Sequence, residues 1–411
     1  MQGIGERQHI LMQLARPLIN KMRSALPRAC RFIARRFALI IRNPNIYIIL
    51  GDEDLEFLSN IIERIEFFAP DVLAKNIRIK KRFGMDCLLG LPPVLSFYGK
   101  LSFADSLYGK LLNRFYVDHR QEIAAWDWVR LSSYYYPEQY SSYQAYANFS
   151  NAISEILSLG YNKSYIFGTG PSLSSAQNRE WNDGARIVCN TIVRDSILFG
   201  HIQPHFIVAG DALYHFSETP FARQFRKDLA ARMEEHDCNF LYPSIFESVV
   251  QRELGHFGRR LIGVPIGGPQ SAEVNLLVDF RLPALGNVLG LLLLPLASTI
   301  SKQIKLFGFD GRSPYDNTSL FWANSRSHSY PELMPSLRKS YPFFFKYYVP
   351  GNDSKSYIEN VHGDLLDSQL ANAEANGFSF ELLHPSWTQT LNRRYHGSQS
   401  PADYYSSLLS Y

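Results

Sequence analysis

The strongest constraint on the fold is a series of short apolar segments between residues 160 and 390, separated by stretches with helical periodicity. Each segment is long enough for one β-strand and ends in residues that break a strand, such as Gly, Pro, Asn or Asp. The segments are KSYIFGTGPSL (163–173), ARIVCNTI (185–192), PHFIVAGD (204–211), CNFLYPS (238–244), RRLIGVPI (259–266), QIKLFGFDG (303–311) and FSFELLHPS (378–386). Strands that alternate with helices predict an α/β fold with a doubly wound, Rossmann-like parallel sheet.

The composition is that of a globular chain. Of the 411 residues, 46% are hydrophobic and only 19% are charged, which excludes global disorder. The length suggests two domains, or one large domain with an appendage. The four cysteines form no CxxC pair and no zinc-ligand pattern, so we expect no structural metal and no disulfide framework, in keeping with a reducing compartment. The longest apolar run, VLGLLLLPLA (288–297), is too short to cross a bilayer and predicts a buried helix.

Positive charge is concentrated near the N-terminus. Residues 1–50 hold nine Lys or Arg and one acidic residue, a net charge of +8, and because the whole chain carries +4 the remainder carries −4. Within 8–23 and 31–42, apolar and basic residues alternate with helical spacing. Residues 1–42 either lie on an anionic membrane surface or pack on the body or on a second subunit of a homo-oligomer. Nucleic-acid binding is disfavoured because no groove motif of aromatic and basic residues accompanies the charge.

These patterns divide the chain into four parts. A basic arm covers residues 1–45, a mixed, mainly helical and aromatic-rich region covers 46–155, the Rossmann-like domain covers 156–395, and a tail covers 396–411. The second part opens with a strand-like run, NIYIILGD (45–52), followed by a helical pattern. The N-terminus has no apolar stretch with a small-residue cleavage site, so we expect a cytoplasmic protein, either free or peripheral at the inner face of the membrane.

Polar residues follow several of the predicted strands. In the GTGPSL motif, Gly168 and Gly170 would let the backbone approach a ligand, and Ser172 with the following amides would cradle a phosphate. The motif is neither GxGxxG nor a Walker A loop, and taken by itself it favours a tight strand-to-helix turn over a phosphate site. Asn190 ends the second strand and Asp211 ends the third. Because the carboxyl ends of parallel strands meet at one edge of the sheet, we expect these residues to line one crevice.

The order of these motifs resembles that of the bacterial sialyltransferases of glycosyltransferase family 42. It also resembles the related domain of flagellar motility accessory factors and archaeal pterin diphosphokinase-like proteins. GTGPSL is similar to the family's GNGPSL-type motif, Cys189-Asn190 to its CN pair, and Gly308-Phe309-Asp310 to its GID-type motif. The resemblance covers roughly residues 160–390 and implies a variant of the GT-A fold.

The resemblance also implies a function. The protein would transfer a CMP-activated acidic sugar, sialic acid-like or 3-deoxy-manno-octulosonic acid (Kdo)-like, to a glycan, glycolipid or protein acceptor in lipopolysaccharide or capsule biosynthesis. The residues implied to hold the donor are Gly168, Thr169, Gly170, Ser172, Asn190 and Asp310. Tyr315 would contact the donor phosphate, and His362, which opens the helix before the last strand, would deprotonate the acceptor hydroxyl. His328 is the rival base.

Several alternatives remain open from the residues alone. Thr169 and Asp211 replace asparagines of the family pattern, so a nucleotide sugar other than CMP-sialic acid is credible. Asp211 would bind a sugar hydroxyl, act as the nucleophile of a retaining mechanism, or cap the following helix. No DxD motif occurs in the Rossmann-like domain, which favours transfer without a metal and with no cofactor besides the nucleotide-sugar donor. The alternative functions are a pterin diphosphokinase-like enzyme that requires ATP and magnesium, and a non-catalytic scaffold of a surface-polysaccharide complex.

Overall fold

The computed structural model divides into two compact units, Met1–Arg120 and Gln121–Tyr411. It describes residues 45–49, 58–70, 76–80, 94–96, 114–116, 124–136, 140–313, 328–347 and 364–408. Residues 1–42 of the basic arm, Tyr315 and His362 lie outside the described residues, so the predictions made for them stay predictions. In the described part of the chain, no helix is both long and apolar enough to cross a membrane.

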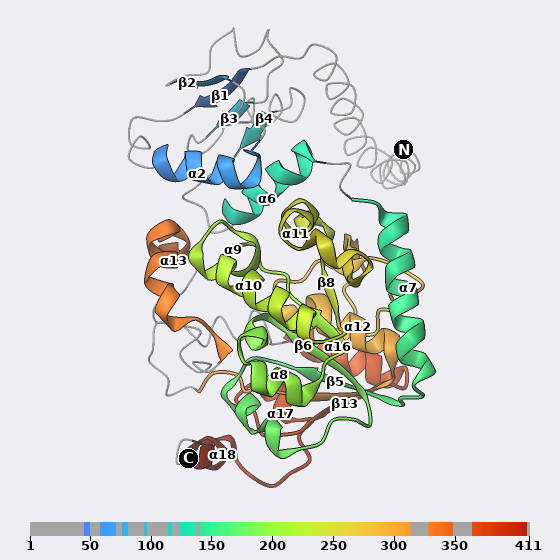
Figure 1. Cartoon of the computed structure of the whole chain (residues 1–411). Helices are drawn as coiled ribbons and strands as arrows, with labels where there is room; N and C mark the ends of the chain where they lie inside the picture. The colour runs from blue at the N-terminus through green and yellow to red at the C-terminus, as the bar shows by residue number, and fades with distance from the viewer. Residues whose placement is uncertain are drawn as a thin grey trace, which may run out of the picture. The chain divides into compact units, whose positions relative to one another are not determined.

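The first unit contains a parallel sheet (Figure 1). Four short strands pair in the order β2–β1–β3–β4: β1 (Asn45–Ile49), β2 (Asn76–Lys80), β3 (Val94–Ser96) and β4 (Arg114–Tyr116). Helix α2 (Leu58–Phe68) buries Ile61, Ile65 and Phe68, which share one helical face. The sequence predicted β1 and the helix, but it expected a mainly helical region and missed the other strands. β3 and β4 have only three residues each, which is too few for an alternating pattern to be recognised.

The second unit is built on a seven-stranded parallel sheet, which confirms the predicted α/β, Rossmann-like fold (Figure 1). The strand order is β13–β12–β5–β6–β7–β8–β9. The strands are β5 (Lys163–Phe167), β6 (Ala185–Cys189), β7 (Phe206–Val208), β8 (Asn239–Pro243), β9 (Leu261–Val264), β12 (Gln303–Phe307) and β13 (Ser379–Leu382). Each of them lies inside one of the seven segments predicted to form a strand.

The chain enters this sheet in its interior. From β5 it winds outward through β6, β7, β8 and β9. It then returns to β12, which pairs with the other side of β5, and continues to β13. The connections that leave β5 and β12 therefore diverge, and the carboxyl ends of these two strands form a topological switch point. Ligands of open α/β sheets bind at such points.

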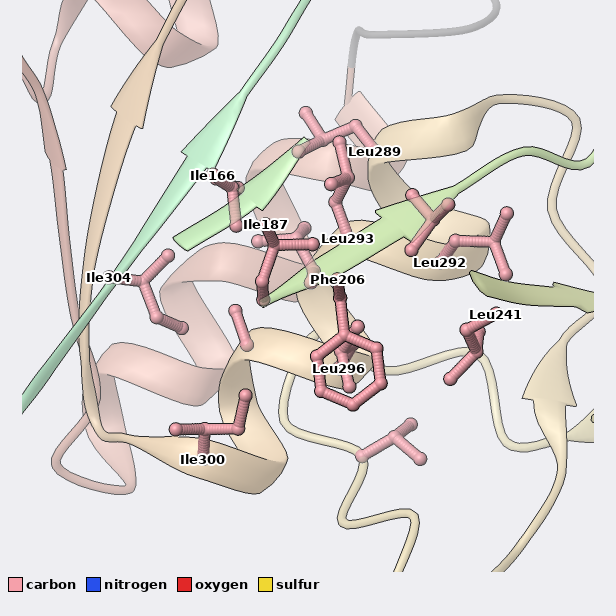
Figure 2. Packing of buried hydrophobic residues seen from close by; sticks show 14 of the residues in the cluster. Ile166, Ile187, Phe206, Leu241, Leu289, Leu292, Leu293, Leu296, Ile300 and Ile304 are labelled. Carbon is pink, nitrogen blue, oxygen red and sulfur yellow. The ribbon is translucent and has the colours of Figure 1, made fainter. Parts of the chain in front are cut away.

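Helices cover both faces of the sheet, as a parallel sheet requires. One face packs against α7 (Ser142–Ser158), the π-helical turn η7 (Leu289–Leu293), α12 (Leu294–Ile300) and α16 (Asp364–Ala375). Figure 2 shows the leucines of η7 and α12 beside the strand residues Ile166, Ile187, Phe206, Leu241 and Ile304. The buried helix predicted near 288–300 is thereby confirmed. On the opposite face the strands carry aromatic rings, and Trp181 lies with its ring centroid 4.9 Å from that of Phe167.

The second unit begins earlier in the chain than the domain start predicted at residue 156. It includes α6 (Ala124–Tyr135), whose Ser132 Oγ lies 2.5 Å from Ser248 Oγ, and α7, whose Phe149 is buried in the core. The smaller elements before β12 are η3 (Pro171–Asn178), η4 (Asn190–Arg194), α8 (Ser196–Ile202), α9 (Ala212–Phe216), α10 (Pro220–Glu235), η5 (Ser244–Phe246), α11 (Glu247–Leu254), η6 (Gly255–Arg260), β10 (Ile266–Gly268) and β11 (Leu282–Pro283). Those after it are η9 (Pro331–Leu333), α13 (Met334–Ser340), α14 (Pro342–Tyr347), α17 (Gln389–Asn392) and α18 (Pro401–Leu408).

Candidate functional site

The loops that leave β5 and β12 are bonded to each other at the switch point. Gly168 N donates to Phe307 O at 2.8 Å, and Gly170 N donates to Gly308 O at 2.9 Å. A Cβ atom on Gly168 would lie 2.5 Å from Gly308 O, closer than real contacts allow. Gly308 has φ +80°, a left-handed conformation that side chains strain. The glycines of both motifs are therefore needed for the two backbones to approach each other.

The carboxylate of Asp310 fills the turn after β5. Ser172 N donates to Asp310 Oδ1 at 3.0 Å and Ser172 Oγ donates to Oδ2 at 2.9 Å. A Cβ on Gly170 would overlap Oδ2 and lie 2.6 Å from Cγ of Asp310. The carboxylate thus occupies the place in which the sequence predicted a phosphate, at the N-terminus of η3. Both side chains are buried and have a structural partner, and their contact with a donor stays a prediction.

Asn190 is the residue of this edge whose geometry most clearly favours a ligand. It follows β6 with φ +52°, a left-handed conformation that asparagine adopts more readily than most residues. The residue is 8% exposed, and its side-chain Oδ1 is buried and has no hydrogen-bond partner among the described residues. A buried acceptor without a partner is destabilising by about 1–3 kcal/mol. Both features are typical of a residue held in place for binding.

His328 lies beside Asn190, although it is distant in the sequence. Its backbone oxygen accepts a hydrogen bond from Thr191 Oγ1, the residue next to Asn190. His328 is 1% exposed, and neither nitrogen of its buried ring has a hydrogen-bond partner among the described residues. Burial lowers the pKa of His328, against the opposite effect of the Asp195 and Asp310 charges. The ring is therefore neutral near pH 7 and has one free lone pair.

Asp211 has the helix-capping position that was one of its three predicted roles. Its Oδ1 accepts hydrogen bonds from Leu213 N and Tyr214 N, both at 2.8 Å, at the start of α9. Burial raises the pKa of this carboxyl group. Its Oδ2 makes no hydrogen bond to a described residue. Thr169 is half-buried in the turn after β5, between the two glycines of the GTGPSL motif.

His384 completes the switch point and was not among the predicted site residues. Its Nε2 accepts a hydrogen bond from Gly308 N at 2.9 Å, and its Nδ1 lies 2.8 Å from Pro385 O. Two tyrosines of α18, in the segment predicted to be a tail, contact the same region: Tyr404 stacks on His384 and Tyr405 bonds to Pro385 O. The signals in the sequence were the HPS string at the end of the last strand and the YY pair in a helical pattern.

The structure thus gathers Gly168, Thr169, Gly170, Ser172, Asn190, Asp310 and His328 at the carboxyl edge of the sheet, with Asp211 at the end of the next strand, β7. In the part of the chain that is described, no group of three or more His, Cys, Asp or Glu side chains is placed to hold a metal ion.

No protein-family model matches the sequence, and no curated protein matches it significantly.

Proposed function

We propose that the second unit is a glycosyltransferase that binds a nucleotide-activated sugar at the carboxyl ends of β5, β6 and β12. The observation that carries the proposal is the pair of buried, unpartnered polar side chains of Asn190 and His328 beside a topological switch point. Open α/β sheets bind ligands, dinucleotides among them, at such a switch point. The motif resemblance adds the chemical class: a CMP-linked acidic sugar, transferred to a glycan, glycolipid or protein.

Asn190 would recognise the nucleoside part of the donor. Its free Oδ1 needs a hydrogen-bond donor, and a cytosine amine or a ribose hydroxyl supplies one. A ligand that satisfies this atom recovers the free energy that burial costs, about 1–3 kcal/mol. Because each 1.4 kcal/mol is a factor of ten, the loss of this bond would weaken nucleotide binding about 5- to 150-fold.

His328 would act as the general base. The acceptor hydroxyl oxygen forms a bond to the anomeric carbon, and the bond from that carbon to the phosphate oxygen breaks so that CMP leaves. The hydroxyl proton moves to the free lone pair of the His328 ring. Because burial lowers the pKa of His328, the base is already deprotonated at pH 7. His362, the base implied by the resemblance, is the alternative.

Nucleotide titration by calorimetry tests the binding site. We expect CMP to bind more tightly than UDP, GDP or ATP with magnesium, and Asn190→Ala to weaken CMP binding about 5- to 150-fold. Asn162→Ala is the matched control, because this exposed asparagine lies just before β5, at the opposite edge of the sheet. A preference for ATP with magnesium would favour the diphosphokinase function. If no nucleotide binds, the enzyme proposal is wrong and the scaffold function is favoured.

A transfer assay tests whether His328 is the general base. With a CMP-sugar donor, His328→Ala is expected to lower the transfer rate about 10²- to 10⁴-fold, which is the usual contribution of a general base. CMP affinity should change little, because the proton moves only during transfer. His362→Ala measured in parallel decides between the two histidines. A His328→Ala enzyme with near-normal rates would exclude His328.

A further inference from the structure

The loop after β13 surrounds the turn that leaves β12. His384 Nε2 lies 2.9 Å from Gly308 N and 3.3 Å from Phe309 N. Further along the same loop, Ser386 Oγ donates to Phe309 O at 2.7 Å and Trp387 N donates to Asp310 O at 2.8 Å. The whole turn from 308 to 310 is therefore held by the segment from 384 to 387. Of these contacts, only the one with His384 Nε2 involves the N–H group of Gly308, whose backbone has the left-handed conformation.

The hydrogen bonds of this cluster require one tautomer of His384. Nδ1 lies 2.8 Å from Pro385 O, which can only accept, so Nδ1 carries the proton. Nε2 then carries no proton, and its lone pair accepts the hydrogen bond from Gly308 N. Ser172 Oγ lies 3.1 Å from the same Nε2, but its one proton is directed to Asp310 Oδ2 at 2.9 Å. Each donor in the cluster has an acceptor, and the imidazole is fixed as an uncharged acceptor.

The cluster connects β13 to the turn after β5. His384 fixes Gly308, and Gly308 O accepts the bond from Gly170 N. Asp310, two residues after Gly308, holds Ser172 through both carboxylate oxygens. The position of the GTGPSL turn therefore depends on a side chain two strands away in the sheet. We propose that His384 is a positioning residue that holds the turns after β12 and β5 in the arrangement that the nucleotide site requires.

The C-terminal helix α18 in turn holds His384. The Tyr404 ring stacks on the imidazole, with centroids 5.8 Å apart and planes 12° apart, and its hydroxyl lies 3.4 Å from Ser175 Oγ in η3. Tyr405 OH donates to Pro385 O at 3.2 Å, the same oxygen that His384 Nδ1 contacts. These contacts fix the plane of the imidazole, so that its Nε2 points at Gly308. The tail predicted at 396–411 is thus part of the positioning cluster.

The test compares two substitutions of similar size. His384→Gln keeps an acceptor that can reach Gly308 N, whereas His384→Leu removes it. Amide hydrogen exchange is measured on the full-length, nucleotide-free protein, for peptides that cover 166–173 and 307–311. Exchange in both peptides should accelerate at least tenfold in His384→Leu and stay within about threefold of wild type in His384→Gln. His396→Leu, in the exposed segment before α18, is the control and should change neither peptide.

Hydrogen exchange is the first readout, and CMP affinity is the second. Only the second readout rests on the proposed function. The Leu variant should bind CMP at least tenfold more weakly, with affinity restored in the Gln variant. If the wild-type protein binds no nucleotide, the proposed function fails while the exchange data still decide whether His384 positions the two turns. Equal exchange in the Leu and wild-type proteins, or in the Leu and Gln variants, overturns the proposal. If His384→Leu does not fold, the same exchange measurement is made on Tyr404→Leu and Tyr404→Phe. Phenylalanine keeps the ring that stacks on His384 and leucine does not, so exchange should accelerate only in Tyr404→Leu.

Discussion

Gly170→Ala is the substitution that most directly tests the turn after β5. The backbone of Gly170 has φ −72° and ψ 168°, a conformation that alanine adopts without strain. Any effect must therefore come from the added methyl group. That group would overlap Asp310 Oδ2 and lie 2.8 Å from Gly308 O, so the carboxylate has to move away from Ser172.

The magnitude follows from what the displaced carboxylate loses. Asp310 is 2% exposed and is held by two hydrogen bonds from Ser172, each of the kind that contributes about 1.5–3 kcal/mol when one partner is charged. Leaving a buried charge without its partner is destabilising by about 3–5 kcal/mol. We therefore expect Gly170→Ala to lower the free energy of unfolding by about 3–5 kcal/mol, a large part of the 5–15 kcal/mol typical of a folded protein.

Urea denaturation followed by circular dichroism measures this loss of stability. Two further variants test whether the loss comes from the contact between the added methyl group and Asp310. Gly200→Ala is the control, because a methyl group there meets its nearest neighbour, His236, at 3.7 Å and adds helix propensity of up to about 1 kcal/mol to α8. In the double variant with Asp310→Ala the overlap with the carboxylate disappears and only the 2.8 Å contact with Gly308 O remains, so Gly170→Ala should cost clearly less when added to Asp310→Ala than when added to the wild-type protein. A loss below about 1 kcal/mol, or additive losses in the double variant, would refute the placement of the carboxylate.

Three further predictions concern the rest of the second unit. Asp211→Ala should lower the free energy of unfolding by about 1 kcal/mol through loss of the cap of α9 and Asp211→Asn by much less; equal losses in thermal melting would contradict the capping role. Burial lowers the pKa of His205 from 6.5 to about 4, so the unfolded chain binds a proton that the folded protein does not; stability is complete above pH 6.5 and falls by about 1–2 kcal/mol by pH 5. His205→Asn, which keeps an acceptor for Arg186 N, should reduce this loss between pH 7 and pH 5, and an unchanged pH profile would exclude His205 as its source. Leu292→Ala in the fully buried helix should cost about 2–5 kcal/mol in urea denaturation, and a loss below 1 kcal/mol would contradict its core position.

The strands of the large sheet could be predicted because a strand that is buried on both faces is a short, continuous run of apolar residues. A segment such as that around Ile166 has apolar residues on both sides and ends at glycine, which distinguishes it from a surface strand or an amphipathic helix. The order of the strands could not be predicted in the same way. Nothing near Gln303 indicates that β12 pairs with β5, more than a hundred residues earlier. The short β3 and β4 were missed because three residues carry no periodicity.

The candidate site was predicted in part, for the same physical reason. Residues such as Gly168, Asn190 and Asp310 follow strands directly, and the ends of parallel strands meet at one edge. The partners of these residues could not be predicted, because the bonds join positions far apart in the chain: 138 residues separate Ser172 from Asp310, and 212 separate Ser172 from His384. His328 was a weak candidate from its loop, and only tertiary packing places it beside Thr191.

The position of Asp310 changes how the GTGPSL turn would take part in catalysis. A loop that cradles phosphate with free N–H groups is ordered by the ligand, and that ordering opposes binding. Here the protein's own carboxylate satisfies Ser172, and the lone pair of His384 satisfies Gly308, so the turn has its bonds before a ligand arrives. Among the described residues, Asn190 and His328 have buried polar side-chain atoms without a hydrogen-bond partner. A nucleotide would then meet a turn that is already rigid and would form its new hydrogen bonds on one side of it, which lowers the entropic cost of binding and keeps a base such as His328 in a fixed position.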